Sequence, residues 1–266
     1  MAKSAQTDGQ AASKRPRSAR NVISNILIVI GVALLLVAAG MWGYARWRYY
    51  KQEQNNQQLA QYAQQAGDGA PSVDWAALKA VNDEVVGWIE VPGTSVSYPV
   101  YQAGDNNKYL RQNAYGDYSI GGQVFLDYEN TAPGMVDAQS VIYGHHLKDG
   151  TMFQPISAME EQSKFDEVST IWYVTEDATY ELMPLFLYWT QETDVDVRTF
   201  DFASYDEFHT YLQDRLAGEG TRASNPNASQ IISNVSHALT LVTCNYEDGY
   251  GRTILVCVPK SEAGVS

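Results

Sequence analysis

A run of 20 uncharged and mostly apolar residues at positions 26–45 limits what this chain can fold into more than any other feature. About 20 such residues form an α-helix that crosses a bilayer. Trp42, Tyr44 and Trp47 lie at the C-terminal end of the run, where aromatic side chains favour the membrane interface. The apolar core of a cleaved signal peptide is shorter, about 7–15 residues, and ends in small residues. We therefore predict an uncleaved transmembrane signal-anchor over residues 23–45.

The charges on the two sides of this run predict its orientation. Five of the first 20 residues are Lys or Arg and one is Asp, a larger basic cluster than the three basic residues that follow the run. Because basic segments stay in the cytoplasm, we expect a cytoplasmic tail over 1–22 and an extracellular body. Residues 46–72 are rich in Gln and Ala and end in Gly-Asp-Gly-Ala-Pro, which predicts a linker without catalytic content before a domain over 73–262.

The body is strongly acidic. Of the 18 Lys and Arg and the 31 Asp and Glu in the chain, eight basic residues and one acidic residue lie in residues 1–51. Residues 52–266 therefore carry ten basic and thirty acidic residues, a net charge of −20. Such a surface repels the phosphates of nucleic acids, so the composition argues against a polynucleotide partner.

Short strands dominate the pattern of the body. Runs rich in β-branched and aromatic residues, separated by Gly and Pro, predict strands at 85–91, 95–100, 123–127, 140–143, 168–174 and 179–189, and a hairpin over 238–258. Capped or amphipathic segments predict helices at 72–82, 105–113 and 204–216. Strands and helices do not alternate regularly, which argues against a parallel doubly wound sheet. We predict a mainly β fold with helices (α+β), built on a closed antiparallel barrel of eight strands.

The final hairpin carries the first chemical candidates. Cys244 lies where its first strand ends, and Arg252 lies where its second strand begins. In this register Cys257 lies opposite residue 239, five positions from Cys244, or about 16 Å along the strand. A disulfide needs Cα atoms within about 7 Å of each other, so we expect two free thiols. Cys244 is then a candidate nucleophile, and Cys257 is a small residue of the core.

A pair of histidines also follows a strand end. His145 and His146 come after the apolar strand at 140–143 and Gly144, and strand ends on one rim of a barrel converge across long sequence separations. A cysteine nucleophile needs such a base nearby. His209 lies in a predicted helix and His237 lies before a strand, so we expect both to be peripheral. No C-x-x-C or H-x-x-x-H spacing occurs, so we expect neither a metal site nor a cofactor.

Several charged residues are candidates to assist Cys244 and a histidine. Arg252 would stabilise the oxyanion of an acyl-transfer intermediate, or it would form a surface ion pair with Glu247 or Asp248. A carboxylate that orients the histidine would come from Asp127, Asp149, Glu247 or Asp248. Their spacing does not distinguish these four carboxylates.

Several motifs together resemble the class B sortases. Thr240-Leu-Val-Thr-Cys244, followed by Arg252, is similar to the family signature T-L-x-T-C…R. Residues 143–153 (Tyr-Gly-His-His-Leu-Lys-Asp-Gly-Thr-Met-Phe) resemble the segment around the family's catalytic histidine. Shorter matches lie at 87–94, 97–100 and 125–128. The resemblance covers residues 73–260 and implies a β-barrel cysteine transpeptidase of Gram-positive bacteria, with a helical insertion before the cysteine strand and a signal-anchor.

The resemblance implies roles for the matching residues. Cys244 would be the nucleophile, His145 the catalytic histidine and Arg252 the essential arginine, whereas His146 would be structural. The substrate-binding positions that it implies are Asn106, Leu110, Tyr143 and Thr243. Many class B sortases have serine two residues before the cysteine, where this chain has Val242, so the resemblance leaves the preferred sorting motif open.

The implied reaction begins with attack of the Cys244 thiolate on the carbonyl of a Thr in the C-terminal sorting motif of a secreted protein. The resulting thioester would pass the protein to an amine, which belongs to a peptidoglycan precursor or, in a pilin-polymerising enzyme, to a pilin subunit. Two alternatives are a secreted cysteine protease that uses water as the acceptor and a membrane-tethered binding module without catalytic activity.

Overall fold

The computed structural model describes residues 19–67, 69–245 and 251–264 of the chain. The chain divides into two compact units, Met1–Trp47 and Arg48–Ser266. Helix α1 (Ala19–Ala60) runs through the boundary between them. Among the described residues, it is the one helix long and apolar enough to cross a membrane, and its most apolar stretch is not buried.

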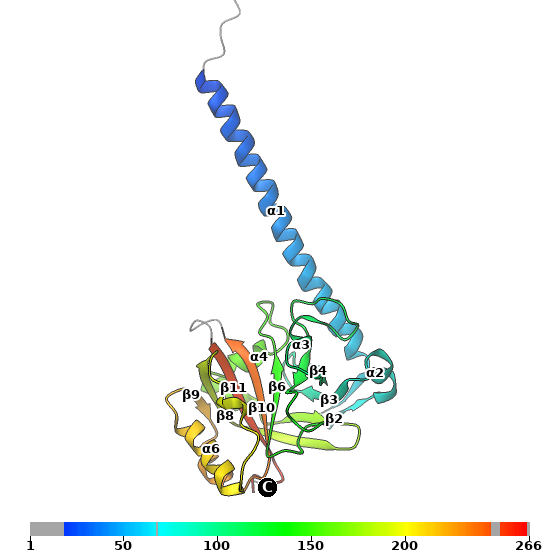
Figure 1. Cartoon of the computed structure of the whole chain (residues 1–266), viewed down its shortest axis with the longest axis vertical. Coiled ribbons are helices and arrows are strands. Elements are labelled where there is room, and N and C mark those ends of the chain that lie inside the picture. Colours follow the sequence, from blue (N-terminus) through cyan, green and yellow to red (C-terminus); the bar gives the residue numbers. More distant parts are fainter. Residues whose placement is uncertain (1–18, 68, 246–250, 265–266) are drawn as a thin grey trace, which may run out of the picture. The chain divides into compact units, whose positions relative to one another are not determined.

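The described part of the second unit contains eleven strands, with short helices in the connections between them (Figure 1). In chain order they are β1 (Ala63–Ala66), β2 (Gly69–Val73), β3 (Val85–Glu90), β4 (Ser97–Tyr101), β5 (Val124–Leu126), β6 (Gln139–Gly144), β7 (Ile171–Val174), β8 (Thr179–Gln191), β9 (Thr221–Ser224), β10 (Ala238–Asn245) and β11 (Gly251–Pro259). The remaining helices are α2 (Trp75–Val81), α3 (Lys108–Arg111), α4 (Gln154–Ala158), α5 (Gln162–Glu167), the 3-10 helix η1 (Asp196–Arg198), α6 (Tyr205–Ala217) and α7 (Ala228–Ile232).

Nine strands of the described part of the chain form one sheet, in the order β11-β10-β6-β5-β4-β3-β7-β8-β9. β11 also pairs with β8, which closes eight of these strands into a barrel and leaves β9 as an addition to β8. The predicted closed barrel of eight strands is therefore confirmed. The expectation that it is antiparallel throughout was wrong, because β4 pairs with β5 and β6 pairs with β10 in parallel. Each of these pairs is joined by a long crossover, which parallel neighbours require.

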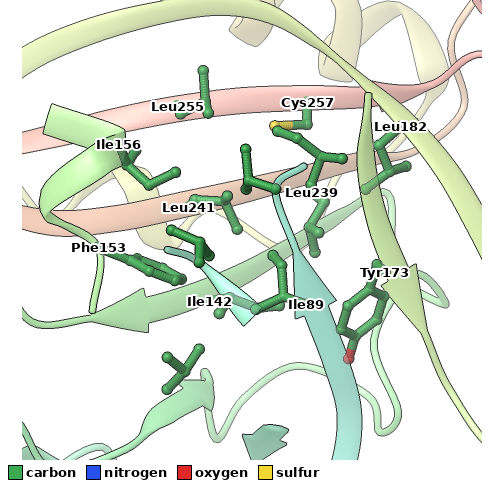
Figure 2. Close-up of a cluster of buried hydrophobic side chains, with 14 of the residues drawn as sticks. Ile89, Ile142, Phe153, Ile156, Tyr173, Leu182, Leu239, Leu241, Leu255 and Cys257 are labelled. Carbon is green, nitrogen blue, oxygen red and sulfur yellow. The ribbon is translucent and has the colours of Figure 1, made fainter. Parts of the chain in front are cut away.

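The barrel interior is filled by apolar side chains from most of its strands (Figure 2). Ile89, Ile142 and Leu241 are fully buried there, and Cys257 contributes its sulfur to the same cluster. Leu239 is the cross-strand partner of Cys257, which confirms the predicted register of the hairpin. Cys257 is a free thiol, and complete burial raises its pKa far above the usual range. Its predicted place in the core is confirmed.

The helix predicted before the cysteine strand is α6. The hydroxyl of Ser204 accepts a hydrogen bond from the backbone N–H of Glu207 at 3.3 Å, which caps the first turn. Phe208 and Leu212 are fully buried and pack into a second apolar cluster that includes Val242 of β10. The insertion therefore covers outward-facing side chains of the barrel, beside β8 and β9 (Figure 1).

Residues 46–72, which we expected to be a linker, contain the end of α1 and the strands β1 and β2. Residues 48–60 of α1 belong to the second unit, and β1 and β2 form an antiparallel hairpin in which Ala63 pairs with Val73. Leu59 is 1% exposed and packs in a cluster with Trp88 and Tyr101. The pattern gave no signal of this packing, because Leu59 is an isolated apolar residue in a Gln-rich stretch.

Candidate active site

The ends of β6, β10 and β11 meet at one rim of the barrel. In the parallel β6–β10 pair, Gly144 lies opposite Thr243. His145 is therefore the first residue after the end of β6, and Cys244 is the next residue along the neighbouring strand β10. In the antiparallel β10–β11 pair, Cys244 lies opposite Arg252. Cα atoms of such partners are about 4.5–5.5 Å apart. The backbone therefore places Cys244 between His145 and Arg252.

The structure describes Cys244 through its backbone. The thiol of Cys244 lies outside the described part of the chain, as do the turn after residue 245 and two of the four candidate orienting carboxylates, Glu247 and Asp248. Strand register fixes the backbone of Cys244 opposite Arg252.

A main-chain carbonyl holds the imidazole of His145. Its Nε2 lies 2.8 Å from the carbonyl oxygen of Leu110. Because a carbonyl oxygen only accepts, Nε2 carries the hydrogen, and Nδ1 is the nitrogen left to take up a proton. Burial lowers the pKa of His145, the charge of Arg111 lowers it further, and the hydrogen bond to Leu110 opposes both effects. The imidazole is therefore mainly neutral at neutral pH.

Close packing against a glycine fixes the backbone of His145. A Cβ atom on Gly144 would lie 2.5 Å from Cγ of Phe153, so the Phe153 ring packs there only because residue 144 is glycine. The N–H of Phe153 donates to the carbonyl of His145 at 2.8 Å. Asp149, another candidate orienting carboxylate, instead accepts hydrogen bonds from the N–H and hydroxyl of Thr151 in the intervening turn.

A pocket of about 190 Å³ lies beside this rim and brings the predicted residues together. It is lined by Asn106, Leu110, Phe125, Tyr143, Gly144, His145, Arg198, Val242, Thr243 and Arg252. All four predicted substrate-binding residues are among them. Thr243 is 1% exposed, and its hydroxyl has no hydrogen-bond partner in the part of the chain that the structure describes. Leu239 and Leu241 of the same strand face the barrel interior, and side chains alternate along a strand, so the side chain of Thr243 is turned toward that interior as well.

A buried carboxylate organises the polar side of this pocket. Asp127 is fully buried and accepts hydrogen bonds from Asn106 Nδ2 at 2.9 Å, the Tyr143 hydroxyl at 2.8 Å and Arg198 Nε at 2.8 Å. Burial alone would raise the pKa of Asp127, but hydrogen bonds, that of Arg198 foremost, outweigh burial and lower the pKa. Asp127 was a candidate to orient the histidine. Its hydrogen bonds instead go to Asn106, Tyr143 and Arg198, three residues that line the pocket.

Arg198 is a pocket residue that was not predicted from the sequence. Its Nη2 also donates to Glu129 Oε2 at 2.5 Å, and its guanidinium lies 5.4 Å from the centre of the Tyr128 ring. The buried amide of Gln139 fixes η1, because it donates to the carbonyls of Val197 and Thr199, the residues on either side of Arg198, at 3.0 Å each. The one signal in the sequence is an arginine in a very acidic body, which does not identify its partner.

The other histidines lie at separate positions. His146 Nδ1 lies 3.1 Å from the Ser157 hydroxyl, and His146 lines a different cavity of about 240 Å³. His209 contacts the carbonyl of Val235 at 2.8 Å, and His237 pairs with Glu262 at 2.8 Å. None of these three is among the residues that line the pocket beside His145.

Comparison with known proteins agrees with this fold and site. The sortase domain family matches residues 89–260, more than half of the chain, so the chain belongs to the sortases, a family of cysteine transpeptidases. Sortase B of Staphylococcus aureus is 29% identical over 227 residues, which cover 83% of this chain and 89% of that protein. Sortase B of Listeria monocytogenes is 28% identical over 240 residues, 85% of this chain and 95% of that protein.

Solved structures lead to the same class. Sortase B of Bacillus anthracis in complex with AAEK1 is similar with a TM-score of 0.67 and 25% identity, over 80% of this chain and 97% of that one. Together with the two sortase B relatives, this similarity places the chain in class B. The resemblance predicted from the motifs is confirmed.

Proposed function

We propose that this protein is a membrane-anchored transpeptidase that cleaves a C-terminal sorting motif after Thr and joins the released protein to an amine of a peptidoglycan precursor. The strand register that places Cys244 between His145 and Arg252 supports this proposal most directly. The signal-anchor over 23–45 would keep 1–22 in the cytoplasm and the catalytic domain over 73–262 outside the cell. Anchoring raises the effective concentration of the site near substrates at the membrane surface.

The first half of the proposed reaction forms a thioester. The neutral imidazole of His145 takes the proton of the Cys244 thiol while the sulfur attacks the carbonyl carbon of the Thr residue. Arg252, with backbone N–H groups, stabilises the oxyanion that forms. The imidazolium then gives its proton to the departing nitrogen, the C–N bond breaks, and the C-terminal fragment leaves as an amine.

The second half transfers the protein to its acceptor. The acceptor amine attacks the thioester carbonyl and gives a proton to His145. The C–S bond then breaks, and the sulfur of Cys244 regains the proton from His145. The products are a new amide bond and the enzyme in its starting state. Water in place of the amine would give hydrolysis, the reaction of a cysteine peptidase.

The pocket suggests how the sorting motif is held. Leu110, Phe125 and Val242 offer an apolar surface, and Asn106 and Tyr143 offer polar groups beside it. The side chains of Asn106 and Tyr143 both donate hydrogen bonds to Asp127, so they are held in place before a peptide binds.

The acceptor can be identified with the full chain in detergent micelles. We would incubate it with peptides that contain candidate sorting motifs, alone and with a glycine oligomer, a diaminopimelate peptide or a lysine-containing pilin peptide, and identify products by mass spectrometry. An adduct with the first or second amine is expected. A preference for the lysine peptide would indicate a pilin-polymerising enzyme. Hydrolysis that no amine changes would indicate a protease, and no turnover would favour a binding module.

A further inference from the structure

A buried glutamine of α1 has an unexpected place in the second unit. Gln52 is 1% exposed, although it lies in a stretch of Gln, Asn and Glu that reads as solvent-facing. Its neighbours behave as expected, because the exposed side chain of Gln57 bonds that of Glu53 on the same helix at 2.7 Å. Burial of an amide is unfavourable unless its polar atoms are paired, so the partners of Gln52 show what the burial achieves.

Both ends of the Gln52 amide are paired. Its Oε1 accepts hydrogen bonds from the Ser119 hydroxyl and, at 3.2 Å, from the N–H of Gly121. Its Nε2 donates to Asn56 Oδ1 at 3.0 Å and lies 3.8 Å from Met152 Sδ. A Cβ atom on Gly121 would lie 3.0 Å from Cδ of Gln52, so the close approach of this loop depends on glycine.

The first segment that Gln52 holds leads to the ring of His145. The loop around Ser119 is bonded to α3 on both sides of Leu110, because Ser119 N–H donates to the Arg111 carbonyl at 2.8 Å and Gln123 N–H donates to the Tyr109 carbonyl at 2.9 Å. The carbonyl of Leu110 in turn accepts the hydrogen bond from His145 Nε2. Gln52 therefore supports the element that orients the imidazole.

The second segment leads to the backbone of His145. Met152 is fully buried and forms an isolated bridge with His146. The next residue, Phe153, bonds the His145 carbonyl and packs on Gly144. Gln52 therefore contacts two segments that reach His145 from different directions.

We propose that Gln52 is a positioning residue for His145, which couples the end of the anchor helix to the active site. The inference rests on the proposed function, in which His145 transfers protons. Gln52 lies outside the 89–260 range of the sortase domain match. A directional amide that joins two segments fixes their relative position, and small displacements of a catalytic group reduce rate strongly.

The test compares Gln52→Leu with Gln57→Leu in the full chain in micelles. Gln57 is the matched control, because it lies on the same helix with its side chain exposed. We expect Gln52→Leu to lower kcat by about tenfold or more with a smaller change in KM, and Gln57→Leu to leave kcat unchanged. Gln52→Glu keeps an acceptor for Ser119 and Gly121, so it should retain more activity than Gln52→Leu.

A spectroscopic measurement separates positioning from stability. In ¹⁵N-histidine-labelled protein, the His145 ring should show one neutral tautomer, with hydrogen on Nε2, and Gln52→Leu should give a mixture. Normal kcat per folded molecule and an unchanged tautomer in Gln52→Leu would overturn the proposal, even if the melting temperature falls. If Gln52→Leu does not fold, Ser119→Ala removes one bond to the same amide and carries the same test.

The variant His145→Ala distinguishes a failure of the inference about Gln52 from a failure of the proposed function. In the parent chain, His145→Ala should abolish transfer from a sorting peptide to an amine. If it does not, the role of His145 is wrong and the proposed function fails with it. If it does, while Gln52→Leu behaves like Gln57→Leu, only the inference about Gln52 fails.

Discussion

The substitution Asp127→Asn should lower the stability of the fold and weaken binding of a sorting peptide in the pocket. The carboxylate is fully buried, and its two oxygens accept five hydrogen bonds, two from Arg198 and one each from Tyr143, Asn106 and the N–H of Glu129. An asparagine side chain has one oxygen and one N–H₂ group in place of the two carboxylate oxygens. Whichever way it is oriented, the N–H₂ group faces hydrogen-bond donors that are bound to an oxygen of Asp127 in the parent protein. At least two of these donors therefore lose their acceptor.

The size of the effect follows from the kind of bond that is lost. A hydrogen bond to a charged group contributes about 1.5–3 kcal/mol, and breaking a buried ion pair costs about 3–5 kcal/mol. The Arg198 side chain is 30% exposed, so water screens part of its charge and we take about 3 kcal/mol. For a unit of this size, about 1 kcal/mol corresponds to about 2–4 °C, which predicts a fall in melting temperature of about 6–12 °C. Asn106 and Tyr143, which line the pocket, would lose their fixed positions, and this should raise KM for a sorting peptide by about tenfold.

Thermal unfolding and peptide kinetics test this prediction, with Glu129→Gln as the control. Glu129 is the other carboxylate bound to Arg198, but its side chain is 45% exposed, so its loss should cost at most about 1 kcal/mol. A depressed pKa gives stability that is present above about 3.9, the ordinary value, and that is lost as the pH falls through the folded-state pKa. The difference between parent and Asp127→Asn should therefore shrink in acid. A variant that melts within about 2 °C of the parent, with an unchanged KM, would refute the reasoning.

Three further predictions follow from the same contacts. Gly144→Ala should destabilise the fold by about 1–3 kcal/mol in denaturant unfolding, because its Cβ would overlap the Phe153 ring, and an unchanged midpoint would contradict that packing. Arg198→Lys should raise KM by about tenfold with little change in kcat, since lysine cannot keep the two-pronged contact with Asp127; equal kinetics would argue against it. The acid limb of kcat/KM should have its midpoint below about 6.5, because neutral His145 takes the thiol proton and burial lowers its pKa; a midpoint above this value would count against His145 as the base.

The fold was largely predictable because its signals are local. Short strands with turn residues between them, and a capped helix before the cysteine strand, indicate the barrel and its insertion without any long-range information. The parallel pairings of β4 with β5 and β6 with β10 were not predictable in this way. Which distant strands become neighbours depends on how the closed barrel packs, and no residue in β5 or β10 marks it.

In the site, too, the residues placed by local signals were predictable and those placed by long-range contacts were not. Cys244 and Arg252 belong to one hairpin, so turn chemistry alone places them opposite each other, and Cys257 falls in the core by the same register. His145 was recognisable as a residue just after a strand end. The pair of Asp127 and Arg198 joins residues 71 positions apart, and no periodic pattern connects them. Gln52 was hidden for a different reason, because its polar neighbours make a buried amide look like part of an exposed helix.

Intact mass measurement of the acyl-enzyme tests the assignment of the nucleophile most directly. The full chain would be mixed with a sorting peptide, quenched in acid and analysed whole and after proteolysis, beside Cys244→Ala and, as matched control, Cys257→Ala. We predict that the parent and Cys257→Ala gain the mass of the peptide up to its Thr, on the fragment that contains Cys244, and that Cys244→Ala gains nothing. An adduct that persists in Cys244→Ala, or turnover of the peptide by that variant, would contradict the assignment of Cys244 as the nucleophile.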